Sequence, residues 1–188
     1  MPAPRFPTYL PGRFVIEPGT MADYHALARF HYRPGKPATV AGIWRVRFVY
    51  REQSKSDQLA GVGVLSYPVP CCRERNIVFR LGGRRYGEKL AFANRNLRTI
   101  SRVIVHPMFR AAGVASLLVR HLCEQCPTRY AEALATMGRV HPFFERAGMT
   151  RTDPDDPDRP VYFHFDRSAH RRGRRHCSPT TSSPRPDG

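Results

Sequence analysis

Residues 101–118 constrain the fold of this chain more than any other segment, because one run, SRVIVHPMFRAAGVASLL, combines three structural signals. β-Branched residues lead up to Pro107 and predict a strand, which ends there because proline has no N–H to donate. A short turn of small residues follows. Apolar residues then recur at helical spacing, at Val114, Leu118 and Leu122. The run therefore predicts a strand, a tight turn and a helix N-terminus in direct succession.

This junction has the chemistry of an anion site. The small residues at 111–113 allow a ligand to approach the backbone closely. The first amides of a helix have no partner within it, and together with the helix dipole they favour negative charge. Arg110 adds a cation beside them. The sequence therefore predicts a phosphate-binding cradle at the start of the helix.

Two motifs resemble the GNAT superfamily of acyl-CoA N-acyltransferases, whose core is similar to residues 100–149. In that superfamily the pattern Gln/Arg-x-x-Gly-x-Gly/Ala holds the pyrophosphate of coenzyme A, and this chain matches it at Arg110, Gly113 and Ala115. Downstream, the run PFFERAGM resembles the superfamily's Phe-Tyr-x-x-x-Gly-Phe segment. The pattern of the whole chain is also similar to a poorly characterised subgroup that is sometimes fused to an ABC-type ATPase.

The resemblance implies an α/β fold with a mixed, mostly antiparallel central sheet, flanking helices and a splay between the fourth and fifth strands. Hydrophobic periodicity along the chain fits that order of elements. Thr20 and Asp23 have the spacing of a capping box and predict the start of the first helix. The strands are expected at 13–17, 43–51, 59–66, 97–106, 130–136 and 161–165, and further helices at 113–125 and from Pro142 to Gly148.

Composition divides the chain into a domain and its flanks. Residues 1–12 form a proline-rich lead-in, and residues 13–166 are expected to form the acyltransferase domain. Within it, residues 71–96 form a basic insert that joins two strands and is long for a simple connection, with a short helix or strand expected near Ile77. Residues 167–188 are rich in Arg, Ser and Pro and are predicted to be a disordered basic tail.

Charge and cysteine content indicate the surroundings of the protein. The formal net charge of +16 attracts anionic partners, and a nucleic acid is one candidate. The sequence has no apolar run long enough for a membrane span and no signal-peptide pattern, so we expect a cytoplasmic protein with reduced thiols. Cys123 and Cys126 form a C-x-x-C motif, but the Cys71–Cys72 pair lacks zinc-ligand spacing, and no metal site is expected.

The resemblance also implies the residues that bind acetyl-CoA as cosubstrate. In the superfamily, the strand that splays from its neighbour pairs with the pantetheine arm as an added strand would. This role is assigned to Val103, Ile104 and Val105. The pyrophosphate is assigned to the backbone of residues 111–115 with the side chain of Arg110. The five cradle residues are Ala111, Ala112, Gly113, Val114 and Ala115.

The resemblance supports the catalytic candidates less directly than the cofactor-binding residues. Many relatives have a Tyr as general acid where this chain has Phe144, which has no proton to give. His141 is the best-placed substitute, and its alternative reading is a helix cap or a surface residue. Glu132 is the acid of an Ala-rich strand beside the splay and is a candidate base; the alternative is a salt-bridged structural residue. Tyr24, His31 and Tyr32 are candidates for lining the acceptor site; the alternative for Tyr24 and His31 is a core-facing position on an amphipathic helix.

Three functions follow as hypotheses. The first is an acetyl-CoA-dependent N-acetyltransferase that acts on an amine of unknown identity. The second is a noncatalytic acyl-CoA-binding module, which the absence of the Tyr favours. The third is an acetyltransferase that binds or modifies nucleic acid through the basic insert and tail.

Overall fold

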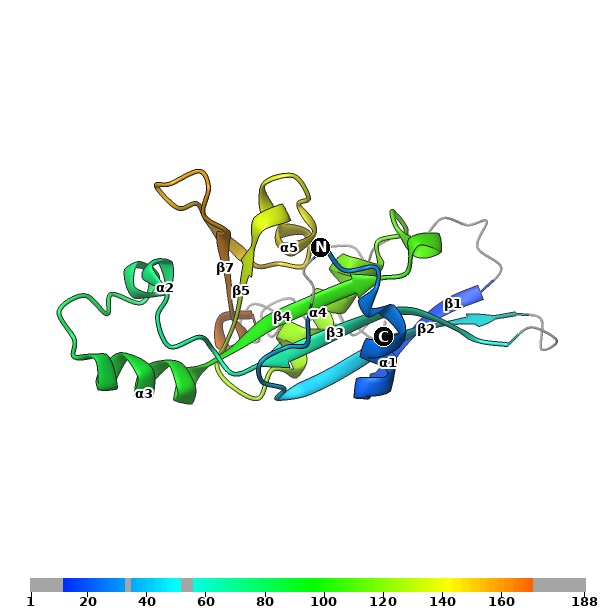
Figure 1. Cartoon of the computed structure of the whole chain (residues 1–188), viewed down its shortest axis with the longest axis horizontal. Coiled ribbons are helices and arrows are strands. Elements are labelled where there is room, and N and C mark those ends of the chain that lie inside the picture. Colours follow the sequence, from blue (N-terminus) through cyan, green and yellow to red (C-terminus); the bar gives the residue numbers. More distant parts are fainter. Residues whose placement is uncertain (1–11, 33–34, 52–55, 171–188) are drawn as a thin grey trace, which may run out of the picture.

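A computed structural model describes residues 12–32, 35–51 and 56–170. The chain folds around one long, strongly twisted sheet, with α1 on one face and α4 on the other (Figure 1). The strands are β1 (Gly12–Pro18), β2 (Gly42–Tyr50), β3 (Gln58–Ser66), β4 (Leu97–Val105), β5 (Tyr130–Ala135), β6 (Thr150–Thr152) and β7 (Val161–Asp166). The helices are α1 (Met21–Ala28), α2 (Arg73–Val78), α3 (Tyr86–Asn96), α4 (Val114–Gln125) and α5 (Phe143–Arg146), with 3₁₀ turns at Pro107–Phe109 and Thr136–Arg139.

The sheet has the strand order β1-β2-β3-β4-β5-β7-β6. All neighbours are antiparallel except β4 and β5, which are parallel. The expected mixed, mostly antiparallel sheet is therefore confirmed. β6 was not predicted, because its three residues, TRT, are too few and too polar to show an alternating pattern.

The two halves of the sheet part between β4 and β5. These strands pair at three positions, from Leu97 opposite Tyr130 to Thr99 opposite Glu132. Beyond Thr99 the nine-residue β4 continues beside β3, while β5 turns away. Figure 1 shows that the two strands diverge and that α5 lies near the end where they are farthest apart. The predicted splay between the fourth and fifth strands is confirmed.

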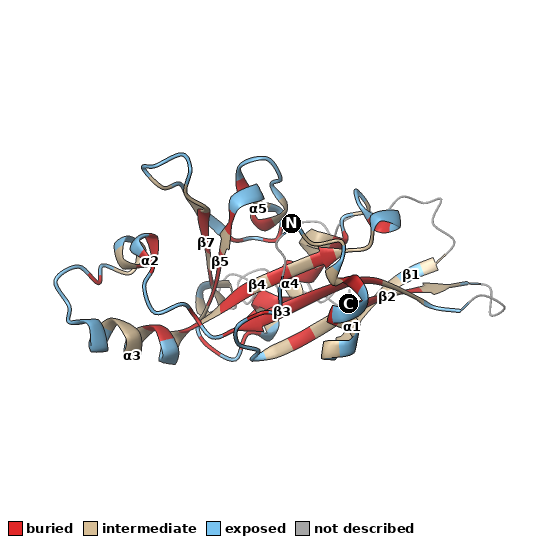
Figure 2. Cartoon of the chain, viewed as in Figure 1, coloured by how far each residue is buried: buried red, intermediate tan, exposed pale blue. Residues whose placement is uncertain are grey.

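Helix α4 covers one face of the sheet very closely. The predicted stripe of Val114, Leu118 and Leu122 is buried against the strands. Gly63 of β3 permits this approach, since a Cβ there would lie 2.7 Å from Leu122 Cδ1 and 3.1 Å from Leu118 Cγ. The buried residues of β3, β4 and α4 form the central band of the core in Figure 2.

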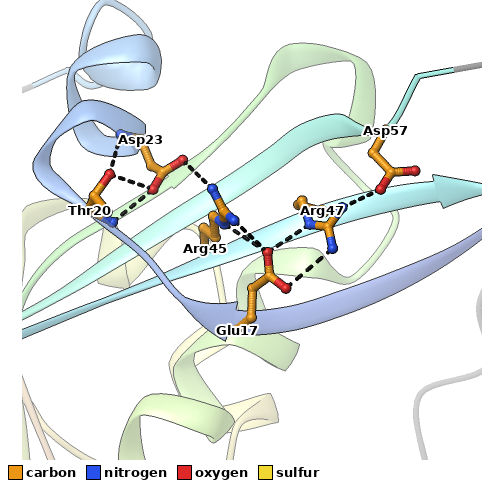
Figure 3. Close-up of polar contacts among 6 residues, drawn as sticks. All are labelled: Glu17, Thr20, Asp23, Arg45, Arg47 and Asp57. Atoms are coloured by element: carbon orange, nitrogen blue, oxygen red, sulfur yellow. Dashed lines mark hydrogen bonds and ion pairs between the residues drawn. The ribbon is translucent and has the colours of Figure 1, made fainter.

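Helix α1 covers the opposite face and is fixed by charged groups (Figure 3). Its predicted capping box is present, with Thr20 and Asp23 bonded in both directions. Arg45 of β2 donates to Glu17 at 2.8 Å and to Asp23 at 3.1 Å, so it ties the helix start to two strands. Arg47 also donates to Glu17 at 2.7 Å, and this hydrogen bond is the largest cause that lowers the pKa of Glu17. The alternating arginines of β2 thus belong to a structural network.

The basic insert folds into two helices. The predicted short element near Ile77 is α2, whereas the eleven-residue α3 was not anticipated. Phe79 packs on Tyr130 of β5, with ring centroids 4.8 Å apart, and this contact places the insert against the half of the sheet beyond the splay. Most of its cationic side chains remain exposed: Arg73, Arg80, Arg84, Arg85 and Arg95.

The flanks differ in part from expectation. The first four residues of the predicted tail, 167–170, form a helical turn after β7, and Arg167 donates to the carbonyl of Cys126. The expected disorder of the remaining tail and most of the lead-in lie outside the described residues. In the described part of the chain, no helix has the length and apolar character needed to span a bilayer.

We expect Gly63→Val to lower the free energy of unfolding by about 1–3 kcal/mol, because the new side chain overlaps Leu118 and Leu122. Urea denaturation measures the change. Gly82→Val is the matched control, because a Cβ at Gly82 has no atom within 4 Å. Equal stability of the two variants would contradict the close packing of α4 on β3.

Candidate functional site

A pocket of about 530 Å³ opens where the sheet splays. The outer edge of β4 forms one wall and the start of α4 forms the base. The segment after β5 and helix α5 close the far side, and the end of α1 contributes aromatic and imidazole groups. The lining residues are Phe30, His31, Tyr32, Val103, Ile104, Val105, Phe109, Arg110, Ala111, Gly113, Val114, Ala115, Ser116, Met137, His141, Pro142, Phe143 and Arg146.

The edge of β4 offers main-chain groups to this pocket. His106 donates its amide to Ala60 of β3, and antiparallel pairs alternate between bonded and non-bonded positions. Val103 and Val105, opposite Gly63 and Gly61, therefore direct their N–H and C=O groups away from β3. Among the strands that the structure describes, none covers that side, because pairing with β5 ends at Thr99. An extended ligand can hydrogen-bond here as an additional strand.

The start of α4 offers a second set of free donors. Gly113 is the N-cap and has no side chain to cap the helix. Within the described residues, the amides of Ala111 and Gly113, and those of the first helical residues 114–116, donate to no acceptor. Ala111 and Gly113 both have left-handed backbones, with φ of 66° and 78°. For Ala111 this conformation is strained, and such strain is typical of ligand-binding turns.

The structure brings most of the predicted cofactor residues into this pocket. Val103, Ile104 and Val105 line it, as do Arg110 and four of the five cradle residues. The exception is Ala112, which packs against the core and donates its amide to Phe109 at 3.4 Å. Of the acceptor candidates, His31 and Tyr32 line the pocket, whereas Tyr24 is buried and bonded to Gly35.

Sequence reasoning missed part of the lining. Arg146 lies on α5, and the described lining contains two arginines and no acidic residue, which suits a polyanionic ligand. The sequence could have indicated Arg146, because this residue lies in the PFFERAGM segment that carried the resemblance. Met137 and Ser116 were not predicted to line the pocket, since they reach it only through the divergence of β5 and the entry of α4.

The two phenylalanines at the start of α5 have different surroundings. Phe144 is buried and stacks on Phe163 of β7 at 4.7 Å, so it belongs to the core. Its neighbour Phe143 lines the pocket instead. His141 is exposed and lines the pocket just before α5.

Glu132 lies in a buried network outside the pocket lining. Arg75 of α2 donates to both carboxylate oxygens, from Nε at 2.9 Å and from Nη2 at 2.6 Å. Thr99 of β4 donates to Oε1 at 2.7 Å and Tyr162 of β7 donates to Oε2 at 2.9 Å. Burial raises the pKa of Tyr162, and the Glu132 charge raises it further, so Tyr162 stays protonated as a donor. The catalytic role of Glu132 stays a prediction, whereas these contacts fit the salt-bridged alternative.

The thiols of the described residues are all unpaired, and three of the four are buried: Cys72, Cys123 and Cys126. Burial raises the pKa of Cys72 to about 11 and raises that of Cys123 as well. The thiols of Cys72 and Cys123 therefore stay protonated at neutral pH.

Comparisons with known proteins agree with this geometry at the level of the fold. No family profile and no curated protein matches the sequence. Among solved structures, a KacTA–DNA complex is 13% identical, with 87% of this chain and 99% of that chain covered at a TM-score of 0.50. An agmatine N-acetyltransferase is 10% identical, with 82% and 100% covered at a TM-score of 0.50. The chain has the acyl-CoA N-acyltransferase fold.

We expect Arg75→Met to lower the free energy of unfolding by about 3–5 kcal/mol, because it leaves Glu132 buried without a counter-charge. Chemical denaturation measures the loss. Arg73→Met, which removes the exposed pair with Asp155, is the control and costs under about 1 kcal/mol. In a double variant, Arg75→Met with Glu132→Gln, the free energy of unfolding is expected to fall by less than the sum of the losses in the two single variants. Additive losses would contradict the coupling.

Proposed function

We propose that this chain is a GNAT enzyme that transfers an acetyl group from acetyl-CoA to an amine. One observation carries the proposal: a single pocket joins the uncovered edge of β4 to five free amides at the start of α4. The edge suits the amides of a pantetheine arm, and the free amides suit a pyrophosphate. Arg110 and Arg146 add charge-assisted donors at the same end.

The geometry of the turn before α4 supports the binding of acetyl-CoA. Left-handed residues such as Ala111 and Gly113 are typical of anion-binding nests, and the amides of both donate to no described acceptor. A Cβ at Gly113 has no protein atom within 4 Å, so open space for a ligand lies beside the cradle. The bound thioester supplies the acetyl group.

The transfer forms a bond between the acceptor nitrogen and the acetyl carbon and breaks the C–S bond. The acceptor loses one proton, and the leaving thiolate gains one. The chain orients both partners in the splay, where a well-positioned pair reacts with little further entropy loss. His141 is the side chain proposed to protonate the thiolate, because Phe144 has no proton and lies in the core.

Gly113→Glu tests the cradle directly. We expect it to weaken acetyl-CoA binding about a hundredfold or more in isothermal titration calorimetry, because the side chain carries negative charge into the amides and their bonds to the pyrophosphate are lost. Gly82→Glu places the same charge where a Cβ also has open space, in the insert and outside the pocket. Wild-type affinity in a folded Gly113→Glu protein would contradict the proposed cofactor site.

His141→Ala tests the proton donor. We expect kcat to fall by about a hundredfold and the high-pH limb of the pH–rate profile to disappear, with little change in acetyl-CoA affinity. His25→Ala removes an exposed imidazole on α1, away from the pocket, and serves as control. An unchanged profile would remove His141 from the mechanism. Binding of acetyl-CoA without turnover of any amine would instead favour the noncatalytic module.

A further inference from the structure

One buried cation near the pocket has no anionic partner among the described residues. Arg102 of β4 is 9% exposed. Its Nη1 donates to the carbonyl of Ser101 at 2.8 Å, but its Nε is buried and donates to nothing. Within residues 12–32, 35–51 and 56–170, no carboxylate forms an ion pair with it. A buried guanidinium without an anion is unfavourable, because its lost hydration is not replaced.

Other arginines of this fold show which partner a guanidinium group binds here. Arg75 uses the edge formed by Nε and Nη2 to bind the two oxygens of Glu132. Arg47 binds both oxygens of Glu17 through the same edge, at 2.7 Å and 3.3 Å. This edge presents two parallel donors that match a carboxylate. In Arg102 neither donor of this edge has an acceptor among the described residues.

A β-bulge determines the face on which Arg102 lies. Val64 pairs with Arg102 while Leu65 pairs with Ile100, so Ser101 is an extra residue in β4. Its effect is visible in the packing, because Ile100 belongs to the core under α4 and Ile104 to the core under α1. A regular strand would put both on one face. Arg102, two residues before Ile104, therefore shares the α1 face.

This face borders the pocket at Ile104, while Arg102 itself lies just outside the described lining. Ile104 lines the pocket, and Arg102 precedes it by about 7 Å along the strand. The edge of β4 beside both residues is uncovered. Phe30, at the end of α1, lines the pocket and packs against the same core as Ile104. The pyrophosphate cradle lies past the other end of β4, so Arg102 is too far along the strand to serve it.

We propose that Arg102 binds the carboxylate of the acceptor, and that the acceptors are small amines carrying a carboxylate close to the amine. The inference rests on the proposed acetyl transfer and names its substrate class. One guanidinium with one free edge balances one negative charge, which suits a carboxylate better than a phosphate dianion. The binding pairs the Nε–Nη2 edge with both carboxylate oxygens and leaves the amine to reach the thioester beside Val103.

The test compares amino acids with the matching decarboxylated amines, such as methionine with 3-(methylthio)propylamine and phenylalanine with phenethylamine. Thiol release from acetyl-CoA is the readout. We expect kcat/KM to be at least tenfold higher for the preferred amino acid than for its decarboxylated partner. Arg102→Gln abolishes that preference with the KM for acetyl-CoA unchanged, and Arg102→Lys retains part of it. Aminoalkyl phosphates are expected to be poor acceptors.

Arg98→Gln is the matched control. Arg98 also lies on β4 and has an Nε without a partner, but it is half-exposed and stacks on Tyr67 at 4.5 Å. Its loss should leave the preference intact. Equal rates for the two members of each pair in the wild type, better turnover of aminoalkyl phosphates, or an unchanged preference in a folded Arg102→Gln protein would each overturn the proposal.

A ligand-binding experiment distinguishes the role of Arg102 from the proposed acetyl transfer. With coenzyme A present, N-acetyl amino acids should raise the melting temperature of the wild type but not of Arg102→Gln, whereas N-acetyl amines without a carboxylate should not. Turnover of neutral amines alone would support acetyl transfer and overturn the role of Arg102. Carboxylate-dependent stabilisation without any turnover would support Arg102 and overturn the transfer. Failure of both experiments would reject both.

Discussion

The divergence of β5 from β4 after Thr99 is the constraint on which the rest of the structure depends. It leaves one edge of β4 without a partner in the middle of the sheet, where unpaired backbone groups are otherwise avoided. The buried carboxylate of Glu132 lies at the last paired position. There it joins β5 to Thr99 of β4, to Tyr162 of β7 and to Arg75 of the insert. Four elements thus fix the point at which the two halves of the sheet part.

Arg75 connects the insert to this junction of the sheet. Two buried charges are stable together only when their geometry and remaining hydrogen bonds are good, and the side-on contact with Glu132 meets that condition. Arg75 also donates to the carbonyl of Val69 at 2.8 Å. The insert is therefore a structural clamp on the splay, whatever its exposed basic surface binds. A nucleic-acid partner for that surface remains a prediction.

Much of this could be predicted from the sequence, because the signals are local. Pro107 ends β4, Gly113 begins α4, and the apolar stripe at Val114, Leu118 and Leu122 sets the buried face of the helix. Pairings between distant segments left no such signal. The contact of Arg75 with Glu132 spans 57 positions, and nothing in the sequence of α2 indicates that one of its arginines is buried.

The bulge at Ser101 was equally hidden, and it reverses the faces of the residues that follow. Alternation alone would place Arg102 on the same face as Ile100, two residues before it. The structure shows it buried on the face that adjoins the pocket. Ala112 illustrates the opposite case, since the motif includes it in the cradle and the turn directs it into the core.

The central claim is that acetyl-CoA binds to the edge of β4 and the start of α4. Amide hydrogen exchange with and without coenzyme A tests it most directly. The amides of Val103, Val105, Ala111 and Gly113, and those at the start of α4, lack internal acceptors and should exchange fast in the free protein. The account predicts that coenzyme A slows exchange at these positions together. Unchanged exchange there, with protection at another site, would contradict it.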